Sequence, residues 1–193
     1  MQITNKTTFK EFAQYTDLLN VSTETMKGVF AKLENYPLPE TIAEKEVPKD
    51  LNHLTWEQLS RLQSCKTSDE LFFVAFEAIL DLKKDDLFDC PAVDVLKFTL
   101  FVKNEIERIA KLFEQIKYKP TGEEVQAGIK ELNFGLFGTL DWWAKRMGFN
   151  SHNEAGQTKW IFIYKCMLND NKTALFERRL RDIHINKSKP KKR

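Results

Sequence analysis

The chain has 193 residues, of which 42% are hydrophobic and 30% are charged, a balance typical of a soluble globular protein with one domain or a tightly joined pair. Seven glycines and six prolines are too few for a protein built of many short strands and tight turns. The net charge is +2, but the segment from Lys187 to Arg193 carries five positive charges and no negative ones. The remainder is therefore faintly acidic, which does not favour general nucleic-acid binding.

The sequence predicts no membrane span and no exported disulfide-rich protein. No stretch approaches 18 uncharged apolar residues, and the first residues lack the apolar region of a signal peptide. The three cysteines, Cys65, Cys90 and Cys166, have neither disulfide-framework nor zinc-site spacing. We therefore expect a cytoplasmic protein with reduced thiols and no membrane partner.

Residues 1–52 are predicted to form N-terminal helices and an extended connection. Thr8 and Glu11 have the spacing of a capping box, which predicts a helix start. A second short helix is expected after Ser22 and before Pro37, because proline disfavours helical backbone at the residue before it. The polar stretch that follows is predicted to be extended.

Residues 53–186 are predicted to form the main helical domain. Capping boxes that begin at Thr55 and Thr67 predict two helices. The longest predicted helix covers about 91–117, since proline at the first turn favours a helix start. Its apolar stripe steps by three and four residues through Val95, Phe98, Val102, Ile106, Ile109, Phe113 and Ile116.

The C-terminal part is predicted to contain a loop and further helices. The segment 133–138 is expected to be a packed loop in which two phenylalanines lie inside, leading into a helix from Thr139. Another helix from about Thr158 is expected to break or bend at 169–171, and the basic tail 187–193 is expected to be flexible when unbound. The predicted fold class is all-α, with six to eight helices around the long central helix.

The sequence contains no recognisable metal, cofactor or catalytic motif. The histidines lie far apart, at His53, His152 and His184. A nucleophile elbow is lacking, and Gly135 and Gly138 fit neither a dinucleotide-binding motif nor a phosphate-binding loop. We therefore expect a protein that is not an enzyme and binds no cofactor.

The most site-like cluster combines aromatic and basic residues within one predicted helix: Trp142, Trp143, Lys145 and Arg146. One indole could be a contact anchor for a partner, since Trp and Arg are frequent in binding hot spots. The pair could equally be partly buried and only hold the preceding loop to the core. A second candidate partner surface comprises Phe176, Arg178, Arg179 and Arg181.

The basic tail is the basis of an alternative hypothesis. Its charges lie at Lys187, Lys189, Lys191, Lys192 and Arg193. They could neutralise nucleic-acid phosphates in a weak, salt-sensitive complex. They could equally form a solvated terminus.

Three features of residues 50–183 together resemble a known class of protein. They are the run Leu54-Thr55-Trp56-Glu57-Gln58-Leu59, the step from Cys90-Pro91 to Phe98, and the block from Phe134 to Arg181. Their order resembles small helical proteins encoded among the virion and tail genes of tailed bacteriophages and prophages of Bacteroidetes-type hosts, including the crAss-like group. Tail assembly chaperones show a similar succession of helix starts.

The resemblance implies a non-enzymatic protein that binds other phage structural proteins, such as tail, portal or capsid components. It implies a location in the host cytoplasm during assembly or in the virion. It carries over no functional residue and leaves open whether the protein is a chaperone or a packaged component. Self-association is also left open.

Overall fold

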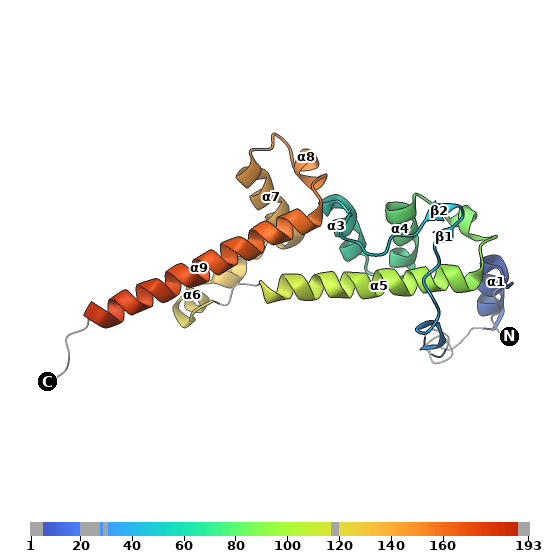
Figure 1. Cartoon of the computed structure of the whole chain (residues 1–193), viewed down its shortest axis with the longest axis horizontal. Helices are drawn as coiled ribbons and strands as arrows, with labels where there is room; N and C mark the ends of the chain where they lie inside the picture. The colour runs from blue at the N-terminus through green and yellow to red at the C-terminus, as the bar shows by residue number, and fades with distance from the viewer. Residues whose placement is uncertain (1–5, 20–27, 29–30, 117–119, 189–193) are drawn as a thin grey trace. The chain divides into compact units, whose positions relative to one another are not determined.

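The computed structural model describes residues 6–19, 28, 31–116 and 120–188, which are predominantly helical with one small hairpin (Figure 1). The all-α prediction is therefore confirmed. The chain divides into two compact units, Met1–Ile109 and Ala110–Arg193. The division predicted at residue 52 falls inside the first unit and stays a prediction. Within the described ranges, no helix is long and apolar enough to cross a membrane.

In its described residues the first unit has several short elements before its longest helix, and most of the helix predicted after Ser22 lies outside the described residues. The elements are α1 (Phe9–Leu19), β1 (Thr41–Ile42), β2 (Lys45–Glu46), α3 (Trp56–Ser64) and α4 (Ser68–Leu80), followed by the 3-10 turn η1 (Lys84–Leu87) and α5 (Ala92–Gln115). The stretch predicted to be extended contains the hairpin, in which Thr41 faces Glu46.

The predicted capping boxes account for the helix starts. Thr8 and Glu11 cap each other's backbone N–H groups before α1, and Thr55 and Gln58 do the same before α3. At α4 the box is incomplete, because the Thr67 hydroxyl accepts from the Glu70 N–H while the Glu70 carboxylate accepts from the Lys66 N–H. Local sequence therefore determines where these helices begin.

The helix α5 matches the predicted long helix within one or two residues and carries the core of the first unit. Its side chains at Val95, Phe98, Val102 and Ile109 are fully buried. The Phe98 ring lies 4.8 Å from the ring of Phe76 on α4, measured between centroids. Figure 1 shows α3 and α4 alongside this part of α5.

Polar side chains of α5 attach the irregular segments of the first unit. The Glu105 carboxylate accepts from the Leu51 N–H at 3.0 Å and from the Arg108 guanidinium at 2.7 and 2.8 Å. Arg108 also donates to the Asn52 side chain at 2.9 Å. The hydrogen bond from Arg108 is the main reason that the pKa of Glu105 lies below its ordinary value.

The second unit contains short helices followed by a long one. They are α6 (Gly122–Gln126), the 3-10 turn η2 (Ile129–Leu132), α7 (Gly135–Met147), α8 (His152–Gly156) and α9 (Trp160–Ser188). Figure 1 shows α7 and α8 beside the first half of α9, whose second half extends past them.

The helix α7 begins earlier than predicted, at Gly135 instead of Thr139. Gly135 has φ +57°, a conformation that costs glycine little. The Asn133 side chain accepts its N–H at 3.2 Å, and the Gly138 N–H donates to the Phe134 carbonyl at 3.1 Å. The glycines therefore start the helix instead of forming a loop before it, and Gly148 caps its end in the left-handed conformation.

Of the break or bend predicted at 169–171, the break is wrong, because α9 is continuous through these residues. Asn and Asp cost a helix only about 0.7 kcal/mol each relative to Ala. Here the Asp170 carboxylate pairs with Arg146, and the Asn171 side chain donates to the Ile116 carbonyl at 2.7 Å. Tertiary contacts thus use the polar side chains that were expected to interrupt the helix.

Replacing Phe98 with alanine tests the role of α5 as the core helix. The fully buried ring would leave a cavity, so we expect Phe98→Ala to lower the free energy of unfolding by about 3–5 kcal/mol in urea denaturation. Phe73, which is 39% exposed on α4, is the control, and its change to alanine should cost much less. Equal losses in the two variants would contradict the assigned burial.

Replacing Glu105 with glutamine tests the attachment of the irregular segment to α5. The pKa of Glu105 is lowered in the folded chain, so the charged carboxylate stabilises the fold at pH values above its ordinary pKa of 4.5. This stabilisation is lost as the pH falls through the lowered pKa. We expect Glu105→Gln to cost about 1–2 kcal/mol at pH 7. The difference from the parent protein in urea denaturation should shrink below about pH 4; a constant difference down to pH 3 would contradict the charge assignment.

Candidate protein-binding site

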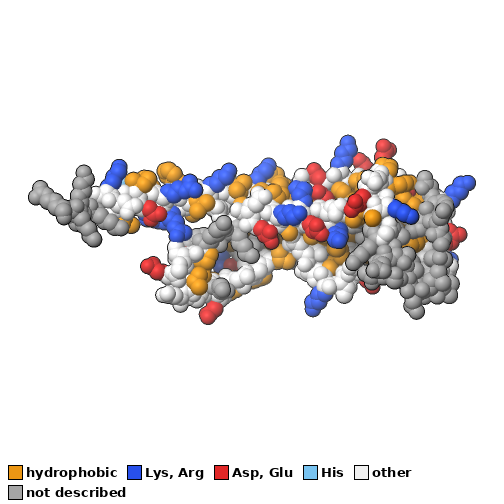
Figure 2. Space-filling model, turned by 90° about the horizontal axis from the view of Figure 1, so that it is seen from below, with side chains coloured by type: hydrophobic (Ala, Val, Ile, Leu, Met, Phe, Trp, Pro, Cys, Tyr) orange, Lys and Arg blue, Asp and Glu red, His pale blue; other side chains and the backbone are white. Residues whose placement is uncertain are grey.

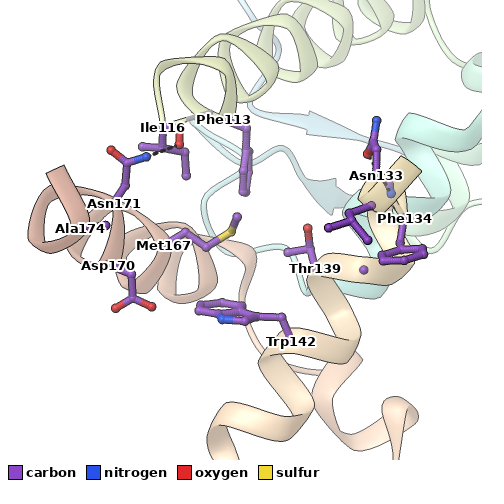
Figure 3. A pocket seen from close by; sticks show the side chains of 13 residues that line it. Phe113, Ile116, Asn133, Phe134, Thr139, Trp142, Met167, Asp170, Asn171 and Ala174 are labelled. Atoms are coloured by element: carbon purple, nitrogen blue, oxygen red, sulfur yellow. Dashed lines mark hydrogen bonds between the residues drawn. The ribbon is translucent and has the colours of Figure 1, made fainter. Parts of the chain in front are cut away.

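An apolar pocket of about 640 Å³ lies in the second unit, within the size range of ligand pockets (Figure 3). The last residues of α5, the start of α7 and the middle of α9 line it. Its apolar lining comprises Phe113, Ile116, Leu132, Phe134, Trp142, Met167 and Ala174. Its polar lining comprises Asn133, Thr139, Asp170 and Asn171.

The inner wall of the pocket rests on buried residues of α9. Trp160 and Ile163 are fully buried. Between ring centroids, Phe113 lies 6.0 Å from Trp160 and 5.5 Å from Tyr164, and the rings of Phe113 and Tyr164 meet edge to face. Phe113 was expected in the core with Phe98, but it is half-buried because one side of its ring faces the pocket. Figure 3 shows Phe113 and Met167 pointing into the same space.

Trp142 forms a second wall and is half-buried. The Arg146 guanidinium lies over its ring, 5.3 Å from the centroid, as in a cation–π contact. Arg146 also forms an ion pair with Asp170 of α9. Two members of the predicted cluster, Trp142 and Arg146, therefore lie together. Trp142 lines the pocket, whereas Arg146 contacts the lining residues Trp142 and Asp170 and links α7 to α9.

Trp143 has a different environment from its neighbour. It is buried, and its indole N–H donates to the Thr158 hydroxyl at 3.0 Å, which ties α7 to the residues just before α9. Of the two roles left open by the sequence, holding the local structure together fits Trp143. The boundary position fits Trp142.

Lys145, the remaining member of the cluster, belongs to a small charged network on the outer side of α7. Its ammonium lies 2.6 Å from the Asp141 carboxylate, and the His152 ring nitrogen lies 3.2 Å from the same group. These two hydrogen bonds, that from Lys145 first, lower the pKa of Asp141. Lys145 is not among the residues that line the pocket.

The rim of the pocket carries exposed apolar side chains. Leu132 and Phe134 both line the pocket and are about two-thirds exposed. Phe134 and Phe137 were expected inside a packed loop, and that expectation is wrong: Phe137 is also exposed, with His152 beside its ring. A Cβ on Gly138 would lie 2.8 Å from the Phe134 Cβ, so the glycine makes room for the rim residue.

The second candidate surface lies apart from the pocket. Phe176, Arg179 and Arg181 are exposed in the second half of α9, and Arg178 is half-buried. None of the four is among the residues that line the pocket. Of the basic tail, Lys187 is exposed in the last turn of α9. Lys189, Lys191, Lys192 and Arg193 lie outside the described residues.

The described residues show no metal-binding group, and their cysteines are not joined in disulfides. Among them, no group of three or more His, Cys, Asp or Glu side chains is arranged to hold a metal ion. The three cysteines are free thiols, and burial is the main cause that raises the pKa of Cys65 and of Cys90. Raised pKa values disfavour the reactive thiolate. The lining of the pocket is mostly apolar, so the pocket can hold apolar groups.

Sequence reasoning did not find the residues that complete the pocket. Ile116, just after α5, meets Met167 and Asn171 of α9, about 50 residues later in the chain, and their convergence is a property of the tertiary structure. A signal for part of the set exists, since Trp160, Ile163 and Met167 are spaced by three and four residues and mark one face of a helix.

Comparisons of the chain with protein-family models, with curated proteins and with solved structures find no match. The geometry of the pocket and the resemblance in sequence are therefore the basis for a functional proposal.

Proposed function

We propose that the protein is a non-enzymatic assembly or virion-associated protein of a tailed bacteriophage, and that its pocket binds an apolar segment of another phage structural protein. The observation that carries the proposal is an open apolar pocket with the half-buried Trp142 in its wall. The phage context comes from the sequence resemblance.

The chemistry of the lining supports an apolar guest. Seven of the thirteen lining residues have apolar side chains. Two of them, Leu132 and Phe134, are exposed and extend the apolar surface beyond the rim. Exposed apolar patches around a concavity are typical of protein-binding sites. Covering Trp142 would add the contact area that makes tryptophan frequent in hot spots.

The walls of the pocket are held in place before any partner binds. Arg146 is held between the Trp142 ring and the Asp170 carboxylate, and Trp143 is fixed by its hydrogen bond to Thr158. A preorganised site loses less conformational entropy on binding. This favours a stable recognition site over an incidental surface hollow.

The polar groups define the kind of segment that fits. Asp170 is the one charged residue among the described lining residues, and it is partly exposed. Asn133 and Thr139 add groups that can accept or donate hydrogen bonds. A leucine or aromatic anchor with a basic or amide-bearing neighbour therefore matches the pocket, in a segment of a tail, portal or capsid protein.

Replacing Trp142 tests the proposal. We expect Trp142→Ala to weaken binding to the partner by about 2 kcal/mol or more, as loss of a hot-spot anchor does. Binding is measured by isothermal titration calorimetry against the purified tail, portal and capsid proteins encoded beside its gene. Met147→Ala is the matched control, because Met147 is an exposed apolar residue of α7 that does not line the pocket.

Either of two results would contradict the proposal. The parent protein could bind none of those structural proteins, or Trp142→Ala and Met147→Ala could weaken binding equally. Circular dichroism of each variant shows whether the helices are intact.

A second candidate function, nucleic-acid binding, is favoured by the charge of the C-terminal part. From residue 172 to the end the chain has nine Lys or Arg and two Asp or Glu. Arg179, Arg181 and Lys187 are exposed in α9, and basic side chains are visible along this helix in Figure 2. Such a surface would bind phosphates through counterion release, without reading sequence.

Deleting residues 187–193 tests this second function. The deletion removes five positive charges, so the protein should lose most of a salt-dependent mobility shift on DNA or RNA while its circular dichroism spectrum stays helical. If the intact protein shifts neither nucleic acid at low salt, the nucleic-acid hypothesis is wrong.

A further inference from the structure

The buried apolar residues in the first half of α9 and three exposed apolar residues in its second half lie on opposite faces of the helix. In the first half Trp160 and Ile163 are buried and Met167 lines the pocket. In the second half Phe176 is 63% exposed. Nine residues separate Met167 from Phe176, and at about 100° per residue this is two and a half turns. The second half therefore directs its apolar stripe away from the face that the first half buries.

The outward stripe has the spacing of a coiled-coil seam. Phe176, Leu180 and Ile183 are separated by four and three residues, and they are 63%, 42% and 50% exposed. This is the d-a-d part of a heptad pattern, the arrangement by which one helix packs against another. Lys187 occupies the next seam position, where two like charges would end the pairing.

The charges beside the seam select the identity and the orientation of the second helix. Thr173, three residues before Phe176, occupies the preceding a position of the heptad pattern. Lys172 comes just before it, at a g position, and Glu177 comes just after Phe176, at an e position. In a parallel pair of identical helices, g of one copy faces the e position five residues later in the other. Lys172 would therefore meet the second copy's Glu177, twice by symmetry, and both residues are exposed.

The antiparallel arrangement is less favourable. In an antiparallel pair a positions face d positions, so setting Leu180 opposite the second copy's Phe176 leaves Ile183 opposite Thr173 and brings the two Arg179 side chains together. Setting Leu180 opposite Ile183 instead leaves Phe176 opposite Lys187. Like charges beside a seam oppose association. The charge pattern thus favours a second copy of the same helix in parallel.

We propose that the second half of α9, from Lys172 to Lys187, pairs in parallel with the same segment of a second copy to form a short coiled-coil dimer. The helix is already formed in the single chain, so pairing does not have to meet the cost of helix nucleation. The seam has only three apolar layers, so the dimer dissociates on dilution. The seam residues Phe176, Leu180 and Ile183 do not line the pocket, so the pairing does not depend on the function proposed for the pocket.

The seam is tested with two leucines of equal exposure. Leu180 lies in the seam, whereas Leu175 lies about 100° outside it on the same helix, and each is 42% exposed. By sedimentation equilibrium at several concentrations, Leu180→Glu should raise the dimer dissociation constant about tenfold or more. Leu175→Glu should leave it nearly unchanged. A parent protein that stays monomeric at all concentrations, or equal effects of the two variants, would overturn the proposal.

The orientation is tested by exchanging the charges at residues 172 and 177. Lys172→Glu alone and Glu177→Lys alone should each weaken the dimer, because each sets like charges against each other. The double variant should restore the parent dissociation constant. Residues 172 and 177 are five positions apart, so within one helix their side chains lie on different faces and do not form an i,i+4 pair. Restored dimerisation in the double variant would therefore show contact between the two copies. Failure of the double variant to rescue would exclude the parallel pairing.

Discussion

The burial of one stripe of α5 is the constraint on which the first unit depends. Val95, Phe98 and Val102 are removed from water, and the ring of Phe76 on α4 lies against that of Phe98. The same helix also attaches the irregular segment before α3, through the hydrogen bond from the Leu51 N–H to Glu105. The hydrophobic effect thus sets the position of the helices, and a few charged groups on the same helix fix the connections.

Much of the helical architecture could be predicted from the sequence because its signals are local. Capping at Thr8 and Thr55 depends on residues three positions apart, and the stripe of α5 depends on a simple period. The bounds of α7 and the continuity of α9 could not be predicted in this way. The start of α7 depends on local bonds of Gly135 and Gly138 that match no capping box, and the continuity of α9 accompanies the contact of Asn171 with the Ile116 carbonyl, 55 residues away.

The candidate site shows the same division between local and tertiary information. The sequence indicates that adjacent tryptophans cannot both face the centre of a core, since successive residues of a helix point in directions about 100° apart. Which of them lies at the boundary depends on Thr158, which pairs with Trp143, and on Asp170, which holds Arg146 at Trp142. Neither partner is recognisable from the sequence around the tryptophans.

The unequal burial of the tryptophans gives the molecule an internal optical reporter. The chain has four, and Trp56, Trp143 and Trp160 are buried while Trp142 is half-buried in the pocket wall. A water-soluble quencher such as iodide would reach the Trp142 indole far more readily than the other three. Intrinsic fluorescence can therefore follow the occupancy of the pocket in the unlabelled protein, with Trp142→Phe supplying the background from the buried rings.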